Sequence, residues 1–374
     1  MAARAPDPGQ RDAALDGLRA VAALSVFGFH AWLYTLSDVH VAAAPNTLTN
    51  ELFAQLRIGL VLFFVLSGFL LYRAWVRSAL AGTPGPATAT YAVRRAGRII
   101  PAYWLAIIGS ALLLYPLAGS PGVRLPPIEL LPLFFIFAQN FSAQTLLKLD
   151  PPMWTLAVEA TFYVVLPLIG WLALRAGRRR NTQLVIPILL LLGGVLFNYI
   201  LAQQNAPPLS WSKSLLAMLP YFAIGMLAAV LIERRSPSLR STRLWIALGL
   251  VLVAADLVMQ IEGLASLRVI RDLPAATGFA LIVVAAAARP PRSLEWRPLV
   301  WVGAVSYGLY LWHVPVLLVL RANGLMPLSP WGATLVGLPI SLLLGWLSLR
   351  LVEKPAMAWS RRTKLLGANV SGSA

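Results

Sequence analysis

The sequence contains no cysteine, and only three of its 374 residues are histidine. Disulfide bonds, thiol nucleophiles and cysteine-ligated metal sites are therefore excluded. The three histidines, His30, His40 and His313, are scattered along the chain, so we expect no metal centre. Acidic residues are also scarce, because 14 Asp and Glu stand against 31 Lys and Arg, which gives a formal net charge of +17.

Charged residues of both signs make up only 12% of the chain, whereas 59% of it is hydrophobic. A soluble domain of this length needs far more polar surface. The apolar residues form long blocks and lack the period-two alternation of barrel strands. The composition therefore predicts an all-α protein, a polytopic transmembrane helical bundle.

The excess of basic residues has two interpretations. In a soluble protein it would suggest a nucleic-acid partner, but no basic domain lies outside the apolar blocks. Positively charged cytoplasmic loops and anionic lipid headgroups account for the charge without such a partner. We therefore expect these cations to face membrane lipid and expect no nucleic acid.

The apolar blocks predict about ten spans, each near the roughly 20 residues that a helix needs to cross a bilayer. A further apolar stretch at 128–141 is shorter and contains a proline, so it suits a re-entrant or interfacial segment. We assign 1–355 to one membrane domain and 356–374 to a short cytoplasmic tail. The predicted spans are 14–34, 57–76, 98–118, 154–174, 183–203, 214–232, 244–261, 272–288, 298–320 and 330–351.

The distribution of basic residues favours this arrangement, with both termini cytoplasmic. It places 24 of the 31 Lys and Arg on the cytoplasmic side and only 7 outside. If 128–141 crossed the membrane, every later loop would change sides and the bias would largely cancel. The outer cations are then Arg57, Arg124, Lys148, Lys213, Arg268, Arg271 and Arg321.

Ionisable side chains inside the predicted spans are functional candidates, because a bilayer makes them costly. Arg19 and His30 lie in the first span, and their spacing comes within about 20° of three helical turns. They therefore share a face and lie roughly 16–17 Å apart along the axis. Glu159 and His313 fall at a depth similar to that of His30, and Asp256 reads as a structural residue. A histidine beside a carboxylate is typical of a general base and its orienting partner.

A second basic feature is the stretch YAVRRAGRII at 91–100. Arg95 and Arg98 lie three residues apart, so they share one helix face at the inner end of the third span. Paired guanidinium groups suit the recognition of phosphate oxygens. Ordinary positive flanking of a span is the alternative, just as an intramembrane histidine can serve packing alone.

Six stretches together carry a specific pattern, which joins R-x10-H, R-x-x-R, a WTLAVE segment and an SYGLYLWH segment. They resemble the bacterial acyltransferase 3 family of integral-membrane O-acyltransferases, in the family's order and over nearly the whole chain. The stretches are LDGLRAVAALSVFGFH (15–30), GLVLFFVLSGFLLYR (59–73), RRAGRIIPAYWL (94–105), MWTLAVEATFY (153–163), VSYGLYLWHVPVL (305–317) and VEKP (352–355).

The resemblance implies an enzyme of the bacterial inner membrane, a multi-pass acyltransferase. Its donor would be cytoplasmic acetyl-CoA or another acyl-CoA, and its acceptor a hydroxyl of a glycan, a glycolipid or a glycosylated metabolite. The family's motifs match Arg19 and His30, then Arg95 and Arg98, and finally Glu159. Relatives often carry a second acid or amide after this glutamate, whereas this chain continues with alanine and threonine.

These expectations combine into one mechanism. Arg19, Arg95 and Arg98 bind the CoA phosphates, and His30 removes the proton of the acceptor hydroxyl while Glu159 orients the imidazolium. His313 contacts the acceptor or polarises the thioester carbonyl. A covalent acyl-histidine relay is a variant of this scheme. The rival class is a polytopic transporter or lipid-glycan flippase, against which stands the lack of evident repeats.

Overall fold

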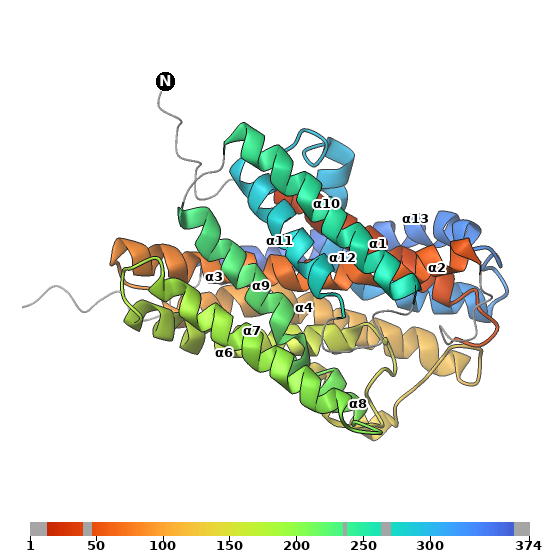
Figure 1. Ribbon diagram of the computed structural model, residues 1–374. Helices are drawn as coiled ribbons and strands as arrows, with labels where there is room; N and C mark the ends of the chain where they lie inside the picture. Colours follow the sequence, from red (N-terminus) through yellow and green to blue (C-terminus); the bar gives the residue numbers. More distant parts are fainter. Residues whose placement is uncertain (1–12, 40–46, 235–237, 263–270, 363–374) are drawn as a thin grey trace, which may run out of the picture.

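The computed structural model describes residues 13–39, 47–234, 238–262 and 271–362. These residues form helices and no strand, which confirms the all-α prediction. Figure 1 shows the long helices running lengthwise through one bundle. The elements are α1 (Ala13–Leu33), α2 (Leu48–Gln55), η2 (Leu56–Ile58), α3 (Gly59–Ala81), α4 (Thr88–Leu114), η3 (Tyr115–Leu117), η4 (Ile128–Leu130), α5 (Pro132–Phe135), η5 (Gln139–Phe141), α6 (Met153–Arg175), α7 (Thr182–Ala202), α8 (Leu209–Ser212), α9 (Leu215–Arg234), α10 (Leu239–Ile261), α11 (Leu273–Ala288), α12 (Arg297–Ala322), α13 (Pro330–Ser348), η7 (Leu349–Glu353) and α14 (Lys354–Arg362).

Nine helices in the described ranges are long and apolar enough to cross a membrane. They correspond to nine of the ten predicted spans. The remaining one, predicted at 272–288, is α11, which has only 16 residues. At the rise of an α-helix it measures roughly 24 Å, a little less than the hydrocarbon core of a bilayer. The structure is thus a polytopic bundle of nine long helices and one short apolar helix within the described residues.

The stretch 128–141 folds into three separate turns, η4, α5 and η5, none of which has more than four residues. It therefore has no helix that could cross a bilayer. Gly122, which follows α4, and Pro152, which precedes α6, line the same cavity. The end of α4 and the start of α6 consequently lie at one end of the bundle, as a non-crossing segment requires.

Two helix boundaries differ from those predicted. The third span was expected to begin at residue 98, yet α4 begins at Thr88. The arginines of this segment lower its hydropathy, but they do not break a helix, and the prolines just before it mark the real start. The last span was expected to end at 351, yet helical structure continues through the π-helical turn η7 to Arg362. Residues 363–374 of the predicted tail lie outside the described residues.

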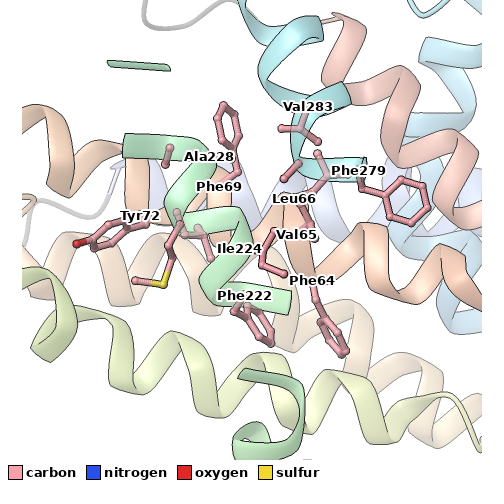
Figure 2. Close-up of a cluster of buried hydrophobic side chains, with 14 of the residues drawn as sticks. Phe64, Val65, Leu66, Phe69, Tyr72, Phe222, Ile224, Ala228, Phe279 and Val283 are labelled. Carbon is pink, nitrogen blue, oxygen red and sulfur yellow. The ribbon is translucent and has the colours of Figure 1, made fainter. Parts of the chain in front are cut away.

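The largest apolar cluster joins α3, α9 and α11 (Figure 2). Phe64 of α3 contacts Phe222 of α9, with ring centroids 4.8 Å apart. Close approach of the two backbones depends on Gly68 and Gly225, because a Cβ at either position would meet a backbone carbonyl of the facing helix. Small residues of this kind allow transmembrane helices to pack closely.

Helices α1 and α12 form the centre of the remaining part of the bundle. They pack along each other, with α3 beside α1 and α13 beside α12. By contrast, α7 and α10 lie at the periphery, and few of their side chains are buried, which leaves these helices in contact with lipid (Figure 1). The polar side chains of α1 and α12 are therefore held between buried helices, where their geometry is fixed by packing.

Candidate active site

His30 of α1 and His313 of α12 form a hydrogen-bonded pair, although 283 residues separate them in the chain. Nδ1 of His30 lies 3.2 Å from Nε2 of His313, and the ring centroids are 4.9 Å apart. Each Nδ1 also lies close to a carbonyl oxygen of its own helix, that of Val26 at 2.9 Å for His30 and that of Tyr310 at 2.7 Å for His313.

These contacts determine which nitrogens carry hydrogen. A carbonyl oxygen only accepts, so Nδ1 of each histidine must donate. In a neutral His313, Nε2 then carries no hydrogen, and its lone pair accepts a hydrogen bond from Nδ1–H of His30. The neutral His30 consequently has its lone pair on Nε2, for which no partner is found among the described residues. The lone pair of Nε2 can accept a proton, as a general base must.

His30 lines a cavity with a volume of about 600 Å³. It lies between the C-terminal end of α1 and the N-terminal ends of α3, α6, α9 and α11. Its wall is partly aromatic and partly cationic. Its lining includes His30, Tyr34, Arg57, Arg124, Trp154, Thr155, Lys213, Tyr221, Arg271, Asp272 and Tyr310.

A second cavity of about 120 Å³ brings together the three arginines predicted from the sequence. Arg19 comes from α1, whereas Arg95 and Arg98 come from α4. The guanidinium carbon of Arg95 lies 5.7 Å from the ring centroid of Tyr163, and Arg19 forms an ion pair with Asp16 one turn earlier. Three guanidinium groups around one cavity have the charge and the hydrogen-bond donors that suit phosphate oxygens.

A third cavity, of about 230 Å³, opens beside Asp16 at the N-terminal end of α1. It shares Arg19, Leu70 and Arg98 with the arginine cavity. The arginine cavity in turn shares four lining residues with the cavity of His30. These four are Leu60, Phe64, Thr155 and Tyr310. The three cavities therefore follow one another along the length of α1, from Asp16 to His30.

Hydrogen bonds join the residues at the boundary between the arginine cavity and the cavity of His30. The hydroxyl groups of Tyr310 and Thr155 lie 2.6 Å apart, and both lie 3.0 Å from the carbonyl oxygen of Pro152. Tyr310 belongs to α12 and Thr155 to α6, so this network joins two helices across the passage. It fixes the tyrosine ring beside the route that leads to His30.

Glu159 lies in the arginine cavity and not in the cavity of His30. Its Oε1 accepts a hydrogen bond of 2.5 Å from the Ser67 hydroxyl of α3. The expectation that Glu159 orients His30 is therefore not met by the geometry, in which the neighbour of His30 is His313. The position of Glu159 along α6 predicted a depth in the membrane similar to that of His30. The packing of α6, however, turns the side chain towards the arginines.

The other intramembrane candidates lie away from the cavities. His313 is buried behind His30 and lines none of the three, so it contacts His30 rather than a bound acceptor. Asp256 of α10 is buried and also lines none of them. His40 lies outside the described residues.

Sequence reasoning missed several polar residues of the site. Ser67, Thr155 and Tyr310 lie within the stretches GLVLFFVLSGFLLYR, MWTLAVEATFY and VSYGLYLWHVPVL, but their residue types are common in membrane helices. The cations Arg57, Lys213 and Arg271 were noted only as loop charges. A signal was present in both cases, since polar groups flanked by apolar residues need partners inside the bundle.

Comparison with known proteins identifies a family and several relatives. The profile of the acyltransferase 3 family, described as an acyltransferase domain, matches residues 12–350. Nodulation protein 10 of Rhizobium leguminosarum bv. viciae is 27% identical over 390 residues, which cover 95% of both chains. The protein named "Putative peptidoglycan O-acetyltransferase YrhL" of Bacillus subtilis is 25% identical and O-acetyltransferase OatA of Staphylococcus aureus 23% identical. Each of these two alignments covers 91% of this chain but only 54% and 56% of the relative.

No solved structure matches the chain. The family profile nevertheless spans all the motifs that supply the histidine and arginine cavities. The chain therefore belongs to the acyltransferase 3 family of integral-membrane O-acyltransferases.

Proposed function

We propose that this protein transfers an acyl group, in particular acetyl, from acetyl-CoA or another acyl-CoA to a hydroxyl of a glycan-type acceptor. The observation that carries the proposal is the series of three cavities that joins the arginines to His30. A donor bound at one end and an acceptor bound at the other would meet at the boundary that Tyr310 and Thr155 form. The protein would act in the bacterial inner membrane.

The arginine end suits the donor. CoA has a compact group of phosphates and a long, thin pantetheine arm that ends in the thioester. Arg19, Arg95 and Arg98 would hold the phosphates by charge-assisted hydrogen bonds. The arm would then extend past Leu60 and Phe64 towards His30, which explains why the polar groups are separated by an apolar passage.

The chemistry at the other end needs one base. Nε2 of His30 accepts the proton of the acceptor hydroxyl as its oxygen attacks the thioester carbonyl carbon. The C–S bond then breaks, and the imidazolium returns this proton to the leaving sulfur, so that an ester and CoA thiol result. During the step, the carbonyl oxygen of Val26 and Nε2 of His313 both accept from Nδ1–H of His30 and thereby stabilise the imidazolium.

Glu159 has a different role in this scheme. Its hydrogen bond to Ser67 and its position among the arginines place a negative charge at the donor end. We assign it the orientation of the guanidinium groups, which would otherwise repel one another.

The names of the relatives give the proposal its acceptor class. YrhL and OatA are named for O-acetyl transfer, and the former name specifies peptidoglycan. We therefore propose a carbohydrate hydroxyl of the cell envelope as the acceptor of this chain too.

The test is acyl transfer by the purified full chain in nanodiscs, with acetyl-CoA as donor and envelope glycans from a deletion strain as acceptors. Release of CoA thiol can be followed with a thiol-reactive dye, because the chain has no cysteine of its own. We expect acceptor-dependent thiol release and an O-acetyl ester in the mass spectrum. His30→Ala should abolish both while CoA binding persists.

Two results would contradict the proposal. Turnover of His30→Ala near that of the unaltered protein would remove His30 from the mechanism. Movement of intact glycan across proteoliposomes without ester formation would indicate a transporter or lipid-glycan flippase instead.

A further inference from the structure

Four cationic side chains gather around the cavity of His30. The positive-inside rule places only seven Lys and Arg on the extracytoplasmic side of this chain, and such residues are disfavoured there. Four of these seven line this single cavity. They are Arg57, Arg124, Lys213 and Arg271.

Two of the other outer cations, Arg321 and Lys148, do not line this cavity. Arg321 donates to the carbonyl oxygens of Tyr34 and Leu36 at 2.6 and 2.8 Å, which joins α12 to the end of α1. Lys148 lines none of the three cavities. Arg268 lies outside the described residues.

Acidic residues are scarce in the lining of the cavity. Among the described residues that line it, Asp272 alone carries a carboxyl group. Its Oδ2 lies 2.9 Å from Nη1 of Arg57 and 3.8 Å from Nε of Arg271, so two guanidinium groups share one carboxylate. The lining thus contains four cationic side chains and one carboxylate.

Lys213 is the cation most clearly available to a ligand. Its ammonium lies 4.1 Å from the ring centroid of Trp154, and its backbone carbonyl accepts from the Asn140 side chain at 3.0 Å. Among the described residues, no carboxylate lies within ion-pair distance of it. A cation–π contact positions the ammonium without neutralising its charge.

We propose that this cavity binds an acceptor that carries an oxyanion, a phosphate or a carboxylate, beside the hydroxyl to be acylated. Lys213 would meet the oxyanion as a point charge, with Arg57 and Arg271 offering guanidinium donors from the same wall. His30, which lines the same cavity, takes the hydroxyl. A volume of about 600 Å³ is in the range of pockets that enclose a small ligand or one or two sugar units. The inference rests on the proposed function, because it assigns this cavity to the acceptor.

The test compares sugars that carry an oxyanion with neutral counterparts of the same sugar. N-acetylmuramic acid is paired with its methyl ester, and methyl glucoside 6-phosphate with methyl glucoside. The full chain is held in phosphatidylcholine nanodiscs without donor, and the dissociation constants are measured by calorimetry. We expect the anionic member of each pair to bind at least about tenfold more tightly. A tenfold ratio of dissociation constants corresponds to a difference in binding free energy of about 1.4 kcal/mol.

Matched variants connect the preference to the cavity. Lys213→Gln should remove most of the difference between the members of each pair, whereas Lys148→Gln, which deletes an outer charge away from the cavities, should preserve it. CoA binding at the arginine end should persist in both variants, which verifies folding. Equal affinities within both pairs, or the same loss in both variants, would overturn the inference.

Two further arms separate the sources of the effect. If phosphatidylglycerol in the nanodiscs occupies the site in a Lys213-dependent manner and no soluble anion competes with it, the site belongs to a lipid headgroup and the inference is overturned. A chain that esterifies neutral and anionic sugars with equal kcat/KM would also overturn it, while the proposed function stands. A chain that distinguishes the probes but never forms an ester would contradict the proposed function alone.

Discussion

Nε2 of His313 lies 3.2 Å from Nδ1 of His30, so a second histidine occupies the place that a carboxylate has in many catalytic triads. His313 does not line the cavity and acts through His30. We predict that His313→Ala lowers kcat about 100-fold and changes KM little, because general-base catalysis contributes about this much and binding is untouched. Steady-state kinetics with varied acceptor would measure both constants.

A conservative variant distinguishes positioning from packing. In His313→Gln the amide oxygen can accept from Nδ1–H of His30, so we expect this variant to recover a large part of kcat. If Gln and Ala lower kcat equally while both proteins unfold at the same temperature as the unaltered chain, the hydrogen bond to His30 has no part in catalysis.

The arginine cavity gives a prediction for the donor. Arg95 and Arg98 line it, whereas Arg94, in the same sequence run, is exposed and lines none of the three cavities. Arg95→Ala and Arg98→Ala should each weaken CoA binding about tenfold or more, because a hydrogen bond to a charged group contributes about 1.5–3 kcal/mol. Arg94→Ala should leave the dissociation constant unchanged.

Dephospho-CoA makes this measurement more specific. If an arginine contacts the 3′-phosphate of CoA, the unaltered protein should bind CoA more tightly than dephospho-CoA. Substitution of that arginine should remove this difference in affinity. A uniform loss across all three arginine variants would mean that these residues set topology or folding rather than bind the donor.

Asp150 supports a prediction about pH. It lies in the loop before α6, is buried, and neither carboxyl oxygen has a hydrogen-bond partner among the described residues. Burial raises the pKa of Asp150 well above its usual value. Its stability contribution is therefore fully present below the pKa of the unfolded chain and is lost as the pH rises through the folded pKa.

It follows that Asp150→Asn should raise the unfolding temperature at neutral pH, since the amide has no proton to lose. The gain should disappear in acid, where Asp150 is protonated in both the folded and the unfolded chain. Thermal unfolding followed by tryptophan fluorescence across pH would show this. A gain that does not depend on pH would show that ionisation of Asp150 does not affect stability.

Much of this architecture was predictable because membrane helices follow hydropathy. The bundle and the joint placement of Arg19 and His30 on α1 follow from apolar length and helical periodicity. The start of α4 was missed because the charges of Arg95 and Arg98 lower hydropathy without breaking a helix. Arg95 and Arg98 thus lie within the helix rather than at its end.

The composition of the site was less predictable. The position of a residue along a span gives its depth in the membrane, but it does not give the neighbouring helix that its side chain faces. Glu159 and His30 were assigned similar depths, yet the packing of α6 against α3 turns Glu159 to Ser67. The pairing of His30 with His313 depends on the contact of α1 with α12, which no local pattern encodes. The gathering of outer cations around one cavity likewise required the fold.

The orientation of the bundle in the membrane is directly testable. Because the sequence contains no cysteine, a single introduced cysteine is the one site that a thiol reagent can label. Gln204 lies between α7 and α8 and Arg179 between α6 and α7; both are exposed, and the charge bias puts them on opposite sides. In right-side-out spheroplasts, a membrane-impermeant maleimide should label Gln204→Cys at once and Arg179→Cys only after permeabilisation. The reverse pattern would invert the bundle and place the arginine cavity outside, away from cytoplasmic CoA. Labelling of both without permeabilisation would mean that α7 does not cross the membrane.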